Sequence, residues 1–205
     1  MQRVALTGGI ASGKSYCLAR FAAAGLPTVD ADVLAREVVT PGTPGFAEVV
    51  AQFGPGIRAA DGTIDRRALG RRIFTDAASR RALEKIIHPR VYAAIHDWFA
   101  ARTREGVRVA IADVPLLYET AHESDFDLVI VAACPEPMQV ARVMARDRLS
   151  EAEARSRVAS QLPLADKARR ANFVIDTAGT TAQTDQQIDA VVRAFHHDGH
   201  EAHED

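Results

Sequence analysis

The residues with the clearest chemical meaning are the eight from Gly8 to Ser15, which read Gly-Gly-Ile-Ala-Ser-Gly-Lys-Ser. The pattern G-x-x-x-x-G-K-[ST] is that of the phosphate-binding P-loop. Its glycines let the backbone curl so that successive N–H groups converge on an anion, and the following helix adds the partial positive charge of its N-terminus. Lys14 can reach the β- and γ-phosphates, and the Ser15 hydroxyl can ligate Mg²⁺. The pattern therefore predicts a nucleoside triphosphate site.

A strand and a helix must flank this loop if it is to hold phosphate. Val4 to Leu6 is an apolar run typical of a buried strand, and residues 16–22 place apolar side chains at helical spacing. The predicted helix runs to about Ala24, before Gly25. A glycine turn that merely happens to precede a helix would not account for the strand in front of it, so we expect a P-loop.

Two carboxylates, Asp30 and Asp32, follow a short strand predicted at Thr28-Val29. Ligands of open α/β sheets bind at the carboxyl ends of strands, and a spacing of two puts both side chains on one face of an extended segment. One of the pair can accept a proton from a substrate hydroxyl or hold a metal-bound water. The alternative is that Asp32 only caps a helix predicted over residues 33–39. With a P-loop upstream, we favour a catalytic role for one of them.

A third carboxylate, Asp113, ends an apolar strand predicted over residues 107–112. This arrangement resembles the second metal-side carboxylate of P-loop enzymes, which lies on a strand next to the P-loop. The alternative is a simple turn aspartate. Residues 115–119 then predict a loop over an acceptor cleft.

Arginines gather in two helical regions. The first, residues 64–104, contains Arg66-Arg67 and Arg71-Arg72, which fit an anionic acceptor. In it, His88-Pro89 predicts a helix break, and His88 fits a capping role or a phosphate contact. The second contains Arg142 and Arg146 on one helix face, before a capping box at residues 150–153. Two helices with convergent arginines predict a lid that closes over triphosphate, and the alternative is a solvated surface.

The elements together predict an α/β P-loop kinase fold, with a parallel five-stranded sheet flanked by helices. Residues 128–133 and 172–176 supply the last two strands. The nucleotide-binding core comprises residues 1–40 and 106–205, with a lid at about 145–168. A helical acceptor-binding insertion covers residues 41–105. The polar, histidine-rich tail at 196–205 predicts disorder rather than a metal site.

Composition restricts the class of protein. The chain has 205 residues with 47% hydrophobic and 25% charged residues, as in ordinary globular proteins, and a net charge of -2 gives no overall basic field for nucleic acid. The first strand begins by residue 3, which leaves no room for a signal peptide, and no apolar run reaches the length of a membrane span. Cys17 and Cys134 are expected to be buried free thiols. A cytoplasmic location without membrane or nucleic-acid partners is the default expectation.

The ordered motifs resemble those of the dephospho-coenzyme A kinase family over about residues 3–195. The motifs are residues 6–10 with 12–15, Val29 to Asp32 with Ala35-Arg36, His88-Pro89, Asp113 to Glu119, Gln161, and Val174 to Asp176. Other small kinases of this fold share the P-loop and the lid, but not the Asp30-Ala31-Asp32 and Pro115-Leu116-Leu117 segments.

The resemblance implies that ATP, with Mg²⁺, phosphorylates the ribose 3′-hydroxyl of dephospho-coenzyme A in the last step of coenzyme A synthesis. It implies that Asp32 is the base and that Lys14, Arg142 and Arg146 neutralise the transferring phosphate. It also implies three sets of binding residues: for ATP, Gly9, Ala11, Ser12, Gly13, Lys14, Ser15 and Tyr16; for the acceptor, Arg66, Arg67, His88, Leu116 and Glu119; for the metal, Ser15 and Asp113.

The chain departs from the family pattern at three places. Ala11 stands where glycine is common, Tyr16 replaces a small hydroxyl residue, and Thr177-Ala178 replaces an Asn-containing turn near the adenine. Two other functions are weighed against this kinase. A kinase for another small anionic acceptor, such as a nucleoside monophosphate, would share the P-loop. A GTP-type switch would need an Asn/Thr-Lys-x-Asp motif after a late strand, where the chain has Cys134 to Pro137 instead.

Overall fold

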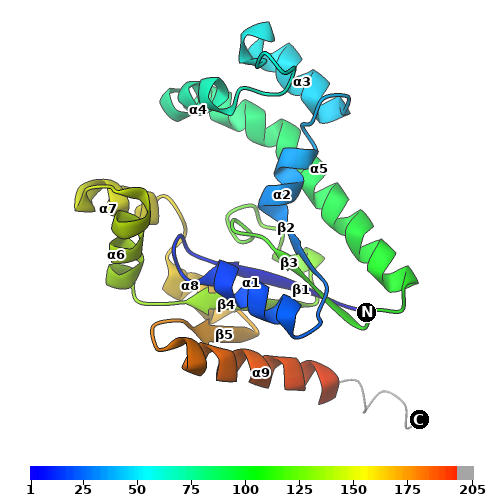
Figure 1. Cartoon of the computed structure of the whole chain (residues 1–205), viewed down its shortest axis with the longest axis vertical. Helices are drawn as coiled ribbons and strands as arrows, with labels where there is room; N and C mark the ends of the chain where they lie inside the picture. Colours follow the sequence, from blue (N-terminus) through cyan, green and yellow to red (C-terminus); the bar gives the residue numbers. More distant parts are fainter. Residues whose placement is uncertain (198–205) are drawn as a thin grey trace. The chain divides into compact units, whose positions relative to one another are not determined.

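A five-stranded parallel sheet carries the P-loop in the structure, a computed structural model that describes residues 1–197 (Figure 1). The strand order is β2-β3-β1-β4-β5. The strands are β1 (Gln2–Gly8), β2 (Thr28–Asp30), β3 (Val109–Asp113), β4 (Leu128–Ala133) and β5 (Phe173–Asp176). All of β3 and most of β4 are buried, as their continuous apolar runs predict. The central strand β1 places Leu6 between Asp113 of β3 and Ile130 of β4.

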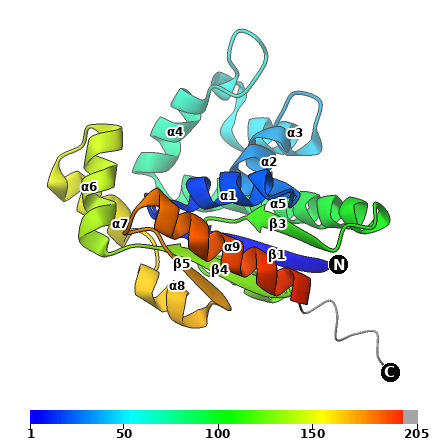
Figure 2. The same ribbon diagram turned by 60° about the horizontal axis from the view of Figure 1, so that its bottom comes forward.

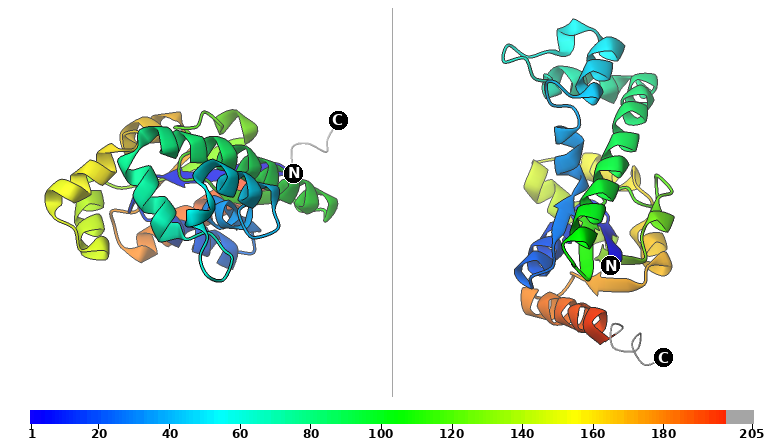
Figure 3. Two further views of the ribbon diagram at one scale, coloured as in Figure 1. Left: turned by 90° about the horizontal axis from the view of Figure 1, so that it is seen from above. Right: turned by 90° about the vertical axis from the view of Figure 1, so that its right-hand side faces the viewer.

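The chain divides into two compact units, of which the first comprises Met1–Val29 and Arg102–Asp205. Its helices are α1 (Lys14–Ala23), η2 (Glu123–Asp125), α6 (Glu136–Asp147), α7 (Glu151–Ala159), α8 (Leu164–Arg170) and α9 (Thr181–His197). Helices α1 and α9 lie side by side, and α1 and α8 lie on opposite faces of the sheet (Figures 2 and 3). Phe21 of α1, Ile188 of α9 and Leu6 of β1 belong to one buried core. The sheet and the fold class are confirmed.

The second unit, Asp30–Ala101, is helical. It contains α2 (Ala31–Glu37), α3 (Pro44–Phe53), η1 (Pro55–Ile57), α4 (Arg66–Thr75) and most of α5 (Ala77–Arg104). Its own apolar core includes Val49, Phe53, Leu69 and Leu83. This unit contains most of the predicted insertion, whose acceptor-binding role remains a prediction.

The helix break predicted at His88-Pro89 is wrong, because α5 continues through Pro89. A proline inside a helix removes one backbone donor and crowds the preceding turn. Here Leu83 before the proline and Val91 after it are both buried, so packing holds the two halves of the helix. The Arg90 guanidinium also donates a hydrogen bond to the Ile86 carbonyl, in the helical turn that contains Pro89.

The predicted histidine-rich tail lies almost wholly outside the described residues. Helix α9 extends to His197 and so includes the first two residues of the predicted tail, and residues 198–205 are not described.

Candidate phosphoryl-transfer site

The P-loop connects β1 to α1, in the predicted order of strand, turn and helix. Gly13 at the start of α1 has a φ of 86°, which suits glycine. A side chain at Gly8 would lie 2.5 Å from Ser12 Oγ and 2.8 Å from the Ala132 carbonyl oxygen, so only glycine fits there. Ala11 has a φ of 56°, in the left-handed region that disfavours side chains. A positive φ explains why glycine suits this position. In this chain Ala11 adopts the same conformation.

Lys14 and Asp113 form an ion pair at the carboxyl ends of neighbouring strands. The Lys14 ammonium contacts both carboxylate oxygens of Asp113, and only 2% of the Asp113 side chain is exposed. Ser15 follows in the first turn of α1 and is exposed. The structure thus brings three of the predicted phosphate- and metal-side residues into one small region.

Two glutamines hold the P-loop peptide at Ile10. Gln161, in the segment between α7 and α8, accepts a hydrogen bond from the Ile10 N–H at 2.7 Å. Gln139 of α6 donates to the Ile10 carbonyl at 2.8 Å. Sequence reasoning did not single out Gln139, because a lone glutamine in an amphipathic helix carries no signal of its own.

The two predicted lid arginines have different partners. Arg142 donates to the carbonyls of Thr177 at 2.8 Å and of Ala11 at 3.2 Å, so it lies against the P-loop. Arg146 instead pairs with Asp147, which also accepts from Arg157 at the turn between α6 and α7. The Arg146 hydrogen bond is the main cause that lowers the pKa of the Asp147 carboxyl. The predicted capping box from Ser150 to Glu153 is confirmed.

Thr177 and Tyr16, two of the residues that depart from the family pattern, form hydrogen bonds in the structure. Thr177 is buried, and its hydroxyl donates to the Ser12 carbonyl at 2.6 Å, so it supports the loop itself. The Tyr16 hydroxyl donates to Asp185 of α9 at 2.7 Å, beside Arg20. That hydrogen bond raises the pKa of the Tyr16 phenol.

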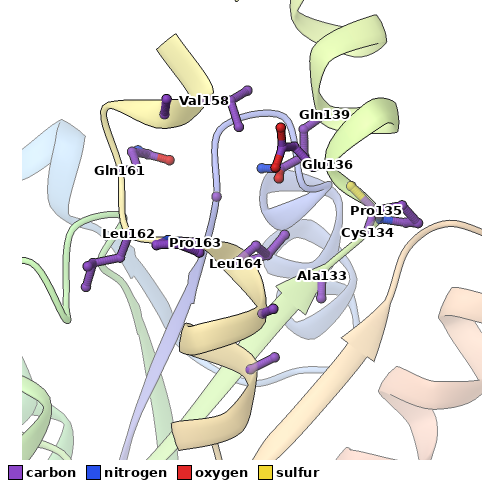
Figure 4. Close-up of a pocket in the computed structure, with 14 residues that line it drawn as sticks. Ala133, Cys134, Pro135, Glu136, Gln139, Val158, Gln161, Leu162, Pro163 and Leu164 are labelled. Carbon is purple, nitrogen blue, oxygen red and sulfur yellow. The ribbon is translucent and has the colours of Figure 1, made fainter. Parts of the chain in front are cut away.

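A cavity of about 480 Å³ opens beside the P-loop, between the end of β4 and the helices α6, α7 and α8 (Figure 4). Its lining is mostly apolar, with Gln139 and Gln161 among the polar side chains. The Cys134 sulfur lies at this lining, and burial raises the pKa of its thiol. Both cysteines are buried and free, as predicted.

The predicted loop after Asp113 brings an unexpected partner to the site. Leu116 is 39% exposed, whereas Glu119 forms an ion pair with Lys167 of α8 at 2.7 Å. Lys167 is fully buried. Sequence reasoning missed it, because a lysine in a short polar helix predicts an exposed side chain.

The expected geometry of Asp30 and Asp32 is wrong. Asp30 ends β2 and is the N-cap of α2, and its carboxylate accepts the Asp32 N–H at 2.7 Å. Helix α2 therefore begins at Ala31, and Asp32 lies in its first turn with an exposed side chain rather than on an extended segment. The cap is thus Asp30 and not Asp32, which leaves the Asp32 carboxylate without a capping task.

The remaining acceptor-side residues also belong to the second unit. Arg66 and Arg67 are exposed at the start of α4, and His88 is half-buried within α5. Within the first unit, the structure gathers the P-loop, Asp113, Arg142, Gln161 and Glu119.

A P-loop on the central strand of this sheet, with an aspartate at the end of the adjacent strand, defines the protein as a P-loop kinase. The family model for dephospho-CoA kinase matches residues 2–183. The chain belongs to the dephospho-CoA kinase family. It is an ATP-dependent kinase of the final step of coenzyme A synthesis, and the predicted identity is confirmed.

Similar proteins support this assignment along almost the whole chain. A dephospho-CoA kinase of Anaeromyxobacter dehalogenans is 48% identical over 179 residues, covering 87% of this chain and 85% of that protein. One from Symbiobacterium thermophilum is 44% identical and covers 95% of this chain and 81% of that protein. The crystal structure of TT1252 from Thermus thermophilus has a TM-score of 0.80 at 30% identity and covers 94% of this chain and 96% of that one. Within residues 1–197, no helix has the length and hydropathy of a membrane span.

Proposed function

We propose that Asp32 is the general base that takes the proton of the ribose 3′-hydroxyl of dephospho-coenzyme A. Two observations support this role. The Asp32 side chain is exposed, and its backbone is held by the Asp30 cap, so the carboxylate stands at a defined place in the first turn of α2. Deprotonation by a positioned carboxylate makes the hydroxyl oxygen a better nucleophile as it attacks the γ-phosphorus of ATP.

The donor half of the proposed site consists of the P-loop, Lys14 and the two lid arginines. The observation that carries it is the placement of the Lys14 ammonium on Asp113, beside the turn formed by Gly9 to Gly13. Lys14 and the loop N–H groups stabilise the charge that develops on the transferring phosphoryl group. Arg142, which lies against the P-loop, and Arg146, near the turn between α6 and α7, add positive charge that stabilises the same phosphoryl group.

The proposed metal ligands are Ser15 and Asp113. A hydroxyl and a carboxylate are the oxygen donors that Mg²⁺ prefers, and Mg²⁺ usually adds substrate phosphates and waters rather than a full protein cage. The described residues contain no cluster of three or more histidine, cysteine or acidic side chains that could hold a metal. When bound, the ion would neutralise charge on the phosphate oxygens.

The acceptor half of the proposed site comprises Arg66, Arg67, His88, Leu116 and Glu119, with the helical residues 41–105 as the acceptor-binding subdomain. Arg66 and Arg67 are exposed and form no ion pair with the described residues, so both guanidinium groups are available to an anion. The Glu119 Oε2 atom is buried and has no hydrogen-bond partner among the described residues, which suits a donor on the acceptor. A cytoplasmic location without nucleic-acid partners stays a prediction.

A coupled assay of ADP release tests this function. The purified chain is given MgATP and, in separate reactions, dephospho-coenzyme A, AMP or another nucleoside monophosphate. Only dephospho-coenzyme A should stimulate ADP release, and mass spectrometry should find the new phosphate on the ribose 3′-oxygen. Equal stimulation by a nucleoside monophosphate would reject the proposed acceptor, whereas phosphate on another hydroxyl would reject only the proposed position.

A further inference from the structure

Lys167 of α8 is a buried cation that the phosphoryl-transfer chemistry described above does not use. None of its side chain is exposed to solvent. The ammonium donates to the Gly8 carbonyl at 3.2 Å and to the Pro115 carbonyl at 3.3 Å, and it pairs with Glu119 Oε1 at 2.7 Å. An ammonium group has three donors, so each of them has an acceptor here. A fully buried lysine is rare, and this one is completely satisfied.

The two carbonyls belong to the segments that form the phosphate site. Gly8 is the last residue of β1 and directly precedes the P-loop turn, and Pro115 lies two residues after Asp113. Thr7 of β1 donates to the same Pro115 carbonyl at 3.3 Å. Lys167 therefore links the end of β1, after which the P-loop and Lys14 follow, to the segment that follows Asp113 at the end of β3.

Glu119 extends this network to the proposed lid. Its Oε1 atom also accepts the backbone N–H of Leu162 at 3.0 Å. The preceding residue, Gln161, accepts the N–H of Ile10 in the P-loop. The segment between α7 and α8 is thus held at two consecutive residues, once by the P-loop and once by the Lys167–Glu119 pair. This segment, residues 160–163, directly follows α7 and connects it to α8.

We propose that Lys167 is a positioning residue for phosphoryl transfer. It holds the P-loop against the segment after Asp113 and, through Glu119, holds the connection between α7 and α8 at the end of the proposed lid. The proposal rests on the donor-site and lid roles proposed above. A buried ion pair is a weak source of folding stability compared with apolar side chains of similar volume. Its three directed contacts instead hold carbonyls and a carboxylate in one arrangement, and small displacements of reacting groups reduce turnover strongly.

The first test is Glu119→Gln, an isosteric change that keeps a carbonyl oxygen for Leu162 and Lys167 but removes the charge. In the full-length protein, we expect kcat at saturation with both substrates to fall about tenfold, while KM for ATP changes less than threefold. Arg169→Met is the matched control, because Arg169 lies on the same helix with a side chain that is 74% exposed. It should leave kcat unchanged. A Glu119→Gln variant with unchanged kcat would overturn the proposal.

The second test separates positioning from stability. Lys167→Met leaves Glu119 charged and unpaired in a partly buried place, and should lower both the melting temperature and kcat. The double variant Lys167→Met/Glu119→Leu replaces the pair with apolar side chains and should recover the melting temperature. Its kcat should stay at least tenfold below that of the wild type. If kcat recovers together with the melting temperature, the pair serves folding only and the proposal is wrong.

Lys14→Ala, measured alongside, separates this proposal from the donor-site assignment. If Lys14→Ala abolishes turnover while Glu119→Gln leaves it intact, only the positioning role fails. If Lys14→Ala keeps its turnover, the donor-site assignment itself fails.

Discussion

The Lys14 ammonium binds both carboxylate oxygens of Asp113, although 98 residues separate the two in the sequence. The pair forms because β3 is hydrogen-bonded to β1, with Leu6 directly opposite Asp113. The carboxylate holds the lysine beside the P-loop, so the ammonium group and the proposed metal ligand Asp113 are direct neighbours. Phosphoryl transfer depends on such placement, since the protein contributes mainly position and charge.

Replacing Lys14 with alanine should lower kcat by about 10²–10³-fold, because the transferring phosphate loses its nearest cation. The measurement is ADP release with saturating ATP and dephospho-coenzyme A. Arg193→Ala, which removes an exposed cation of α9 outside the proposed site, serves as the control and should behave as the wild type. Turnover within a few-fold of the wild type in Lys14→Ala would mean that the P-loop assignment is incorrect.

Asp32 and Asp30 should respond differently to the same change. Asp32→Asn should lower kcat by about 10²–10⁴-fold with little change in the affinity for ATP, because a general base acts on the acceptor. Asp30→Asn should keep kcat within a few-fold, since asparagine caps helices as well as aspartate does. The readouts are kcat and the dissociation constant of ATP. If Asp32→Asn loses only ATP binding, Asp32 belongs to the metal side of the site.

Asp30→Ala adds a stability measurement to this pair. Removal of the N-cap of α2 should lower the free energy of unfolding by about 1 kcal/mol, which urea denaturation can resolve. Asp32→Ala should change it much less, because the Asp32 side chain caps nothing. Equal losses in the two variants would contradict the assignment of the cap.

Arg142 and Arg146 should separate into two kinetic classes. Arg142→Met should raise KM for ATP about tenfold or more, because its guanidinium group supports the P-loop carbonyl of Ala11 and the Thr177 carbonyl, each a hydrogen bond of a charged group. Arg146→Met should lower kcat with a smaller effect on KM, since its side chain is 58% exposed near the turn between α6 and α7 and bonds to no atom of the P-loop. Steady-state kinetics with varied ATP distinguish the two. Identical profiles would show that both arginines act as one unit.

Cys17 makes stability depend on pH above neutrality. Burial raises the pKa of its thiol from 9.0 to about 11. Between these values the unfolded chain loses the thiol proton while the folded chain keeps it, so the free energy of unfolding falls as pH rises. The expected loss is on the order of 2 kcal/mol at pH 11, and nearly none at pH 8.

The matching experiment compares urea denaturation of the wild type and Cys17→Ala at pH 8 and pH 10.5. Cys17→Ala should be less stable at pH 8, because it leaves a cavity in the core, but its stability should fall less steeply with pH. Equal slopes in the two proteins would mean that the thiol pKa is not raised.

The sequence by itself determined the features that depend on neighbouring residues. The P-loop needs only glycines, a lysine and a serine at fixed spacing between a strand and a helix, and all of these are local. The capping box from Ser150 to Glu153 is similarly local, and the structure confirms it. The apolar run from Leu128 to Ala133 is long enough to specify a buried parallel strand without further information.

Tertiary structure decided the features that need distant partners. Pro89 stays within a helix because packing on both sides outweighs the local cost of proline. Lys167 is buried because carbonyls from two separate strand ends and one carboxylate meet at its ammonium group, which no short window of sequence can reveal. The same holds for Arg142, whose partners are 131 and 35 residues away. Spacing along the chain therefore determined which residues are predicted to bind phosphate, whereas the order of the strands determined which charged groups hold those residues in place.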